Sequence, residues 1–302
     1  QKLYFPKKKK TMRLFFRILG GFILLFFFIF TYFHFLGTID LRTQEAKNKP
    51  DEKRAKALLR EMGEAHGILN WENINTYSAI YEQIFFGNLG SNSHGYPEDS
   101  VRFLLQYIPK TYDGKLEFIS GENEEWSWGI QSGKSYVYRD GSGFKFREDK
   151  DIMFWIPTYQ YFIEFPLRIQ NATSFAYAGE SEIDGKLCEG IIASWNTTKP
   201  QREIDQYLIW LNKRSKRIVK IEFTIRKMYN FLSGAAYFRD YKNYGGILLP
   251  SLIPVESNLL KDGFLHEMRI LDFSINSFPM KELRPNRALS PLGDLTQKIN
   301  LF

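Results

Sequence analysis

The pattern of hydrophobic and polar positions divides the chain into one continuous apolar stretch and a long region of alternating positions. The apolar stretch is residues 18–37, ILGGFILLFFFIFTYFHFLG, which contains no Asp, Glu, Lys or Arg. At ~1.5 Å per residue, a helix of this length matches the ~30 Å hydrocarbon core of a bilayer. A helix satisfies its own backbone hydrogen bonds in lipid, so the pattern predicts a transmembrane helix over residues 18–37.

The charges that flank this stretch predict its orientation. Residues 1–17 form a basic tail with seven Lys and Arg and no acidic residue, whereas charges of both signs follow residue 37. Because an excess of Lys and Arg stays on the cytoplasmic side, we expect a single-pass inner-membrane protein with a cytoplasmic N-terminus and a periplasmic bulk. A cleaved signal peptide is the alternative, but the apolar run is long and lacks a small-residue cleavage site, which favours an uncleaved signal anchor. Arg13 and Arg17 give the same orientation if Met12, and not Gln1, is the true start.

Beyond the apolar stretch, the periodicity first indicates a helix. Residues 38–50 are polar and predict a linker. Residues 51–66 then place Leu58, Leu59 and Met62 on one face at helical spacing, which predicts an amphipathic helix that packs on a sheet.

From residue 73 the hydrophobic period becomes two, which predicts strands. The expected strands are residues 74–86, 101–108, 115–120, 125–131, 134–138, 143–147, 174–182, 186–195, 205–211, 217–226, 235–241, 247–256 and 265–275. Tight turns between them, such as Asp140-Gly141 and Asp184-Gly185, predict antiparallel hairpins. Residues 276–302 predict an irregular tail.

Residues 150–166 interrupt these strands with the densest aromatic cluster outside the apolar stretch. Pro157 and Pro166 bracket a short stretch of helical spacing, and Pro157 is expected in the first turn of a helix.

Composition narrows the classes of partner. The chain has 41 Lys and Arg against 34 Asp and Glu, a net charge of +7, and the basic tail accounts for the whole excess. Residues from 18 onward are therefore neutral, and the isoelectric point near 9.2 does not indicate binding to nucleic acid. The single cysteine, Cys188, excludes an internal disulfide and a thiolate zinc site.

The sequence contains no constellation that supports catalysis. Its four histidines are scattered, and His266-Glu267 does not continue as a zinc-binding HExxH motif. We find no nucleophile elbow, phosphate-binding loop or dinucleotide fingerprint. The sequence therefore predicts a protein that is not an enzyme and that uses no cofactor or metal.

Aromatic residues are the most distinctive chemistry of the chain, at 17% of all positions. In residues 207–211 both faces of the expected strand are apolar, which a single core beneath a flat sheet does not explain. A strongly curved sheet wrapped over helices explains both faces and leaves two possibilities open, a lipid-sized cavity or a fully packed interior.

One hairpin carries a resemblance to a known family. Residues 206–223 read QYLIWLNKRSKRIVKIEF, an aromatic and Trp-containing strand, a basic turn and a Lys-Ile-Glu strand. Together with the helix at residues 51–66 and the Pro-bracketed insert, this hairpin resembles the periplasmic lipoprotein-carrier (LolA/LolB-like) superfamily and its outer-membrane lipoprotein-sorting proteins. The resemblance covers residues 51–275. It implies an unclosed β-barrel around helices that shelters acyl chains, without a catalytic motif.

The sequence thus predicts an α+β, mainly β fold, a curved antiparallel sheet (unclosed β-barrel) wrapped over helices and preceded by one transmembrane helix. Our hypothesis is a membrane-anchored, non-catalytic binding protein for lipid or lipoprotein acyl chains at the outer face of the inner membrane. The alternative is an envelope scaffold with a fully packed core that binds a protein partner. The candidate ligand-binding residues are Leu58, Leu59, Met62, Trp126, Trp128, Phe154, Trp155, Tyr159, Phe162, Trp195 and Trp210.

Overall fold

The computed structural model describes residues 8–35, 37–121, 124, 126–139 and 143–289. The chain forms two compact units, Gln1–Thr38 and Ile39–Phe302. Helix α1 (Lys8–Phe35) makes up the first unit.

Helix α1 corrects the prediction for residues 18–37. Leu36 of that range lies outside the described residues. Within the described ranges, no helix combines the length and the apolar character required to cross a bilayer. The predicted signal anchor is therefore not found, and the predicted single-pass inner-membrane localisation is wrong.

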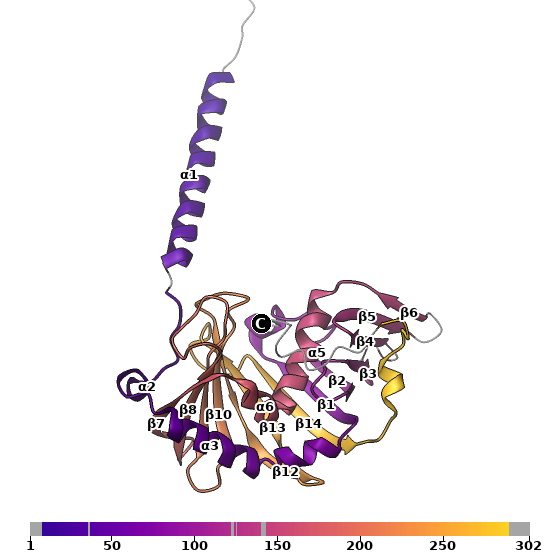
Figure 1. Ribbon diagram of the computed structural model, residues 1–302. Helices are drawn as coiled ribbons and strands as arrows, with labels where there is room; N and C mark the ends of the chain where they lie inside the picture. Colours follow the sequence, from indigo (N-terminus) through magenta and orange to yellow (C-terminus); the bar gives the residue numbers. More distant parts are fainter. Residues whose placement is uncertain (1–7, 36, 122–123, 125, 140–142, 290–302) are drawn as a thin grey trace, which may run out of the picture. The chain divides into compact units, whose positions relative to one another are not determined.

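The second unit is built on one antiparallel sheet of 14 strands (Figure 1). In chain order the strands are β1 (Tyr77–Phe85), β2 (Ser100–Tyr107), β3 (Gly114–Phe118), β4 (Trp126–Gln131), β5 (Lys134–Arg139), β6 (Gly143–Phe146), β7 (Ser174–Ile183), β8 (Lys186–Ser194), β9 (Tyr207–Asn212), β10 (Ile218–Thr224), β11 (Ser233–Tyr237), β12 (Arg239–Tyr244), β13 (Ile247–Ser257) and β14 (His266–Ile275). Their order across the sheet is β6-β5-β4-β3-β2-β1-β14-β13-β11-β10-β9-β8-β7, with β12 paired to β13 outside this path. The sheet is curved and unclosed, as predicted, because β6 and β7 remain its two edges.

Helices lie against both faces of this sheet. They are α2 (Gln44–Asn48), α3 (Glu52–Ala65), α4 (Gly87–Ser91), α5 (Lys150–Ile163), α6 (Phe165–Arg168) and the short 3₁₀ helices at Ile68–Asn73, Ile169–Asn171 and Met280–Leu283. Helices α5 and α6 lie on the concave side of the sheet (Figure 1).

Side-chain caps fix where the two long helices begin. Asp51 accepts a hydrogen bond from the backbone N–H of Arg54 at the start of α3. Asp149 accepts one from Ile152 at the start of α5. Because of this cap, α5 begins earlier than predicted, and Pro157 lies inside the helix and not in its first turn.

Two separate hydrophobic clusters explain why β9 is apolar on both faces. The inner cluster fills the space between the sheet and helices α3, α5 and α6, and it includes Ile209 and Leu211. The outer cluster lies on the opposite face, where Leu41 and Ala46 cover Leu208 and Trp210. The curved sheet is thus buried on both sides at β9.

Candidate functional site

The centre of the candidate site is one face of α5. Trp155, Tyr159 and Phe162 follow one another at intervals of four and three residues, so they project from the same side of the helix. All three side chains are buried, and Tyr159 is 0% exposed. The ring centroid of Tyr159 lies 5.0 Å from that of Tyr81 and 5.3 Å from that of Phe103. Helix α5 therefore carries its aromatic face into the sheet.

Helix α3 covers another part of the same inner cluster. Leu58, Leu59 and Met62 are buried there, as their helical spacing predicts. Glycine at position 63 permits the close approach of the next segment, because a Cβ at this position would lie 2.6 Å from Cδ1 of Ile68.

Four candidate residues lie at the margin of the inner cluster and remain half-buried. They are Trp126, Trp128, Phe154 and Trp195. Trp128 packs between Tyr96 and Phe118, with ring centroids 5.2 Å away in both cases. Trp195 donates a hydrogen bond from Nε1 to the carbonyl oxygen of Asn171. The inner cluster thus has an aromatic margin that water reaches.

Trp210 is the one candidate residue that the structure places elsewhere. It lies in the outer cluster, and its Nε1 donates to Oε1 of Glu222 at 3.0 Å. Its ring covers Gly190, where a Cβ would lie 2.7 Å from the ring. The sequence could not assign this face, because both faces of β9 are apolar.

A buried ion pair inside the unit escaped the sequence analysis. Glu164 and Arg168 are 0% and 1% exposed, and Arg168 Nε lies 2.9 Å from Glu164 Oε2. The Tyr77 hydroxyl, the Gln160 amide and the backbone N–H of Lys110 also donate to Glu164. The carboxylate is held by four donors, so its role is structural. The only signal in the sequence is the i, i+4 spacing of an acid and a base within an apolar insert.

The buried histidines do not provide a base for chemistry near neutral pH. Burial lowers the pKa of His66 to about 4 and that of His266 to about 3. Burial also raises the pKa of the Cys188 thiol, which disfavours the reactive thiolate. In the described ranges, no group of three or more His, Cys, Asp or Glu side chains is placed to bind a metal ion.

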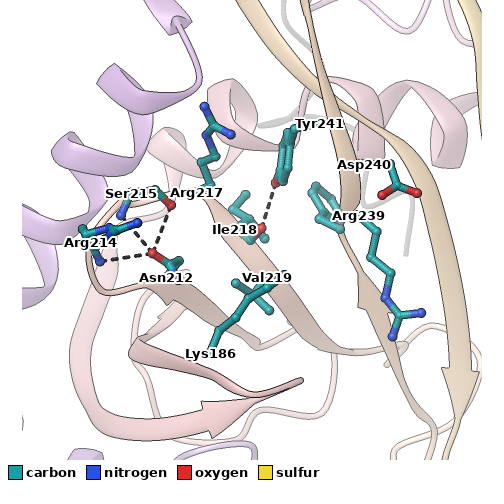
Figure 2. Close-up of a pocket in the computed structure, with 11 residues that line it drawn as sticks. Lys186, Asn212, Arg214, Ser215, Arg217, Ile218, Val219, Arg239, Asp240 and Tyr241 are labelled. Carbon is teal, nitrogen blue, oxygen red and sulfur yellow. Dashed lines mark hydrogen bonds between the residues drawn. The ribbon is translucent and has the colours of Figure 1, made fainter.

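Three pockets open at the surface of the β-unit. The first, of about 440 Å³, is at the turn between β9 and β10 and the start of β12 (Figure 2). A second, of about 330 Å³, is beside the same turn, and a third, of about 650 Å³, lies on the exposed side of α3. None of the eleven candidate residues lines any of these three pockets.

Comparison with known proteins gives similarity at the level of structure. No family model matches the chain, and no curated protein matches it. A DUF1329 family protein from Desulfovibrio piger is similar in structure, with a TM-score of 0.51 and 10% identity over 78% of this chain and 97% of that chain.

Two further solved structures are similar over about the same region. One is a putative outer membrane lipoprotein-sorting protein domain from Vibrio parahaemolyticus, with a TM-score of 0.49 and 14% identity over 76% of this chain and 97% of that chain. The other is a LolA superfamily protein from Nitrosomonas europaea, with a TM-score of 0.47 and 12% identity over 76% of this chain and 96% of that chain. At such identities the likeness concerns the fold. The unclosed antiparallel sheet wrapped over helices agrees with the architecture that the resemblance to the LolA/LolB-like superfamily implies, and the similarity to the Desulfovibrio piger protein is one of fold.

Proposed function

We propose that this protein is a non-catalytic binding protein for lipid or lipoprotein acyl chains. The observation that carries the proposal is the continuous inner cluster of apolar and aromatic side chains, which an unclosed sheet encloses and which ends in a half-buried aromatic margin. The shared LolA/LolB-like fold supports it.

We place the acyl chain along the aromatic face of α5, within a binding domain that spans residues 51–275. Ten of the eleven candidate residues belong to the inner cluster or pack against it, and we leave out Trp210 because it lies in the outer cluster. The proposed lining is Leu58, Leu59, Met62, Trp126, Trp128, Phe154, Trp155, Tyr159, Phe162 and Trp195.

The inner cluster is closely packed, so an entering chain must move side chains apart. Each CH₂ group that leaves water gains about 0.8 kcal/mol, which offsets the energy needed to separate the packed rings. The half-buried residues Trp128 and Phe154 are the least costly to move, because part of their surface already faces water. Binding should therefore be saturable and should strengthen with the length of the acyl chain.

The test uses the full-length chain and a fatty acid that quenches tryptophan by contact. 9,10-Dibromostearate is titrated into the protein, and lipids bound during expression are extracted for mass spectrometry. We expect saturable quenching of the tryptophan fluorescence. Replacing Trp155, in the inner cluster, by Phe should reduce the quenched fraction, whereas the matched change Trp210→Phe in the outer cluster should not. Equal effects of both variants, or no saturable quenching, would contradict the proposal.

The packing of the rings favours one second candidate, a scaffold that binds a protein partner. Tyr81 and Phe103 stack with centroids 5.5 Å apart, and Trp155 and Tyr159 stack at 5.7 Å. Such contacts stabilise the core without a ligand. A chain that yields no bound lipid and shows no quenching would support this scaffold and not the lipid-binding protein.

A further inference from the structure

The sheet has a break between β10 and β12. The sequence predicts one strand over residues 235–241, but the structure divides it into β11 and β12. Strand β11 pairs with β10 only from Lys220 to Thr224, and β12 turns away to pair with β13 alone. A positive φ of 52° at Asp240 accompanies the change of direction. Ile218, the first residue of β10, therefore lacks a paired strand on this side, whereas the carbonyl oxygen of Val219 accepts a hydrogen bond from the backbone N–H of Phe238.

Side chains replace the missing strand at Ile218. The backbone N–H of Ile218 donates to Nε2 of His66 at 3.2 Å, and its carbonyl oxygen accepts from the Tyr241 hydroxyl at 2.9 Å (Figure 2). His66 and Tyr241 also contact each other edge to face, with ring centroids 5.3 Å apart. On this side of β10, the side chains of His66 and Tyr241 thus hold Ile218, which pairs with Leu211 of β9 on the other side.

The pocket of about 440 Å³ lies at this break. Its lining includes Ile218 and Phe238, which belong to the inner cluster, and Val219, which belongs to the outer cluster. The pocket thus borders both clusters. Its inner end adjoins the proposed acyl site, because the ring of Phe238 lies 6.5 Å from that of Phe162 on α5.

The rim of this pocket is positively charged. Lys186, Arg214, Arg217 and Arg239 line it, and Asp240 is the acid among the lining residues. Arg239 pairs with Asp184 at 2.8 Å. Of the other three cations, none forms an ion pair with a described residue, although Arg217 lies 5.9 Å from the ring of Tyr241. Figure 2 shows Arg214 and Arg217 on one side of the pocket and Arg239 on the other.

The neighbouring lysines behave differently. Lys213, Lys216 and Lys220 each pair with a glutamate, namely Glu180, Glu189 and Glu222. Among the cations of residues 212–220, Arg214 and Arg217 have no such partner in the described ranges, and both line the pocket, on a domain that is neutral as a whole. The turn that carries two of them is also fixed in place, because Asn212 Oδ1 accepts hydrogen bonds from the backbone N–H groups of Arg214 and Ser215.

We propose that the pocket at the β10–β12 break binds the phosphate group of an amphiphile whose acyl chain enters the interior beside Phe238. This inference rests on the function proposed above and names the class of ligand. Guanidinium groups suit a phosphate because their paired N–H donors match two of its oxygens. The apolar residues at the inner end suit the first methylene groups of the chain.

Three probes separate the headgroup from the chain, and calorimetry of the full-length protein measures each. 1-Oleoyl lysophosphatidate carries both parts, 1-oleoyl glycerol carries the same chain without phosphate, and glycerol 3-phosphate carries the phosphate alone. We expect lysophosphatidate to bind about tenfold more tightly than 1-oleoyl glycerol, and glycerol 3-phosphate to bind much more weakly than both.

Single substitutions test whether the pocket causes this difference in affinity between lysophosphatidate and 1-oleoyl glycerol. Arg217→Gln, and separately Lys186→Gln, should weaken the binding of lysophosphatidate by about three- to tenfold and leave 1-oleoyl glycerol unchanged. The matched control is Lys213→Gln, which removes a charge from the same turn but not from the pocket. All three side chains are exposed, so the variants should fold.

The outcomes distinguish this inference from the proposed function. If the two oleoyl probes bind equally and no variant changes their affinity, the headgroup site is wrong while acyl binding stands. If glycerol 3-phosphate binds as tightly as lysophosphatidate, and Arg217→Gln weakens both, the pocket is a site for soluble phosphate and the amphiphile is wrong. If neither oleoyl probe binds, the proposed function itself fails.

Discussion

At the scale of single residues, Asp205 shows how burial sets a charge state. Its Oδ1 accepts hydrogen bonds from the Thr224 hydroxyl and from the backbone N–H of Arg226, each at 2.8 Å. Burial raises the pKa of this carboxyl group to about 6, and the two hydrogen bonds and the Arg226 charge oppose the rise only in part. The folded state thus holds the proton more tightly than the unfolded chain does.

The raised pKa of Asp205 predicts a loss of stability as the pH increases. Between pH 4 and pH 6 the folded protein binds more protons than the unfolded one, so the free energy of unfolding falls across this window, by roughly 3 kcal/mol from this group. The Asp205→Asn variant lacks this pH-dependent contribution to the free energy of unfolding. We expect the stability of the wild type relative to this variant to decrease by that amount from pH 4 to pH 7, measured by urea denaturation. The exposed Asp240→Asn is the control, and an equal change there would contradict the assignment.

His66 predicts the opposite dependence. Burial lowers its pKa to about 4, and the neutral ring accepts from Ile218 while it donates from Nδ1 to the Leu248 carbonyl. Its contribution is present above the unfolded pKa of 6.5 and is lost as the pH falls toward 4, by roughly 3 kcal/mol. Relative to His66→Gln, the wild type should lose stability from pH 7.5 to pH 4. A difference that does not change with pH would show that the ring is not held neutral.

At the scale of elements, the hairpin β4–β5 depends on one glycine. Tyr136 is completely buried and lies across Gly129, where a Cβ would come within 2.0 Å of the Tyr136 ring. We therefore expect Gly129→Ala to destabilise the protein by about 1–3 kcal/mol, because the buried ring has to shift. Ser127→Ala, on the same face two residues earlier, keeps the Cβ and should have a much smaller effect. Thermal denaturation of both variants measures the difference, and equal losses would exclude the close approach as the cause.

Elements whose hydrophobic positions recur with a strong period could be predicted from the sequence. The apolar face of residues 51–66 predicted α3, and the hydrophobic period of two over residues 217–226 predicted a strand where β10 lies. Helical spacing brought most candidate residues to the inner cluster, because seven of the ten lie on α3 and α5, where residues three and four apart share a face. Trp210 was placed on the wrong side of the sheet. Odd- and even-numbered positions of β9 are both apolar, so the sequence does not indicate which face of the strand is the inner one.

Other features depend on contacts that a local pattern does not contain. The buried pair of Glu164 and Arg168 relies on Tyr77 and on the loop at Lys110, which are distant in the sequence. The division of residues 235–241 into two strands falls at Phe238, and a positive φ follows at Asp240; neither position carries a glycine or proline as a signal. The apolar run at residues 18–37 indicated a membrane span from composition alone, and the described helix did not support it.

At the scale of the whole β-unit, the two edges of the sheet are protected to different degrees. Residues 43–51 cover the free side of strand β7. The backbone carbonyl of Asp51 accepts a hydrogen bond from the backbone N–H of Tyr177, and the Thr43 hydroxyl donates one to the carbonyl of Ala178. The polar residues 38–50 therefore act as a strap over the outer cluster and this edge. Strand β6 pairs with β5 alone, and all four of its residues are exposed. An uncovered edge is where a sheet opens most easily.

This asymmetry predicts the pattern of amide hydrogen exchange. Strand β1 pairs with both β2 and β14 in the middle of the sheet, so its amides should exchange on the order of a hundredfold or more slowly than those of Gly143–Phe146 in β6. Strand β7 should lie between them, because residues 43–51 cover its edge. Replacing Thr43 by Val removes the hydroxyl that bonds to Ala178, and it should speed exchange in β7 while leaving β6 unchanged. Exchange in β7 as fast as in β6 in the unmodified protein would mean that the strap does not protect this edge, and that the outer cluster around Trp210 is held by the sheet alone.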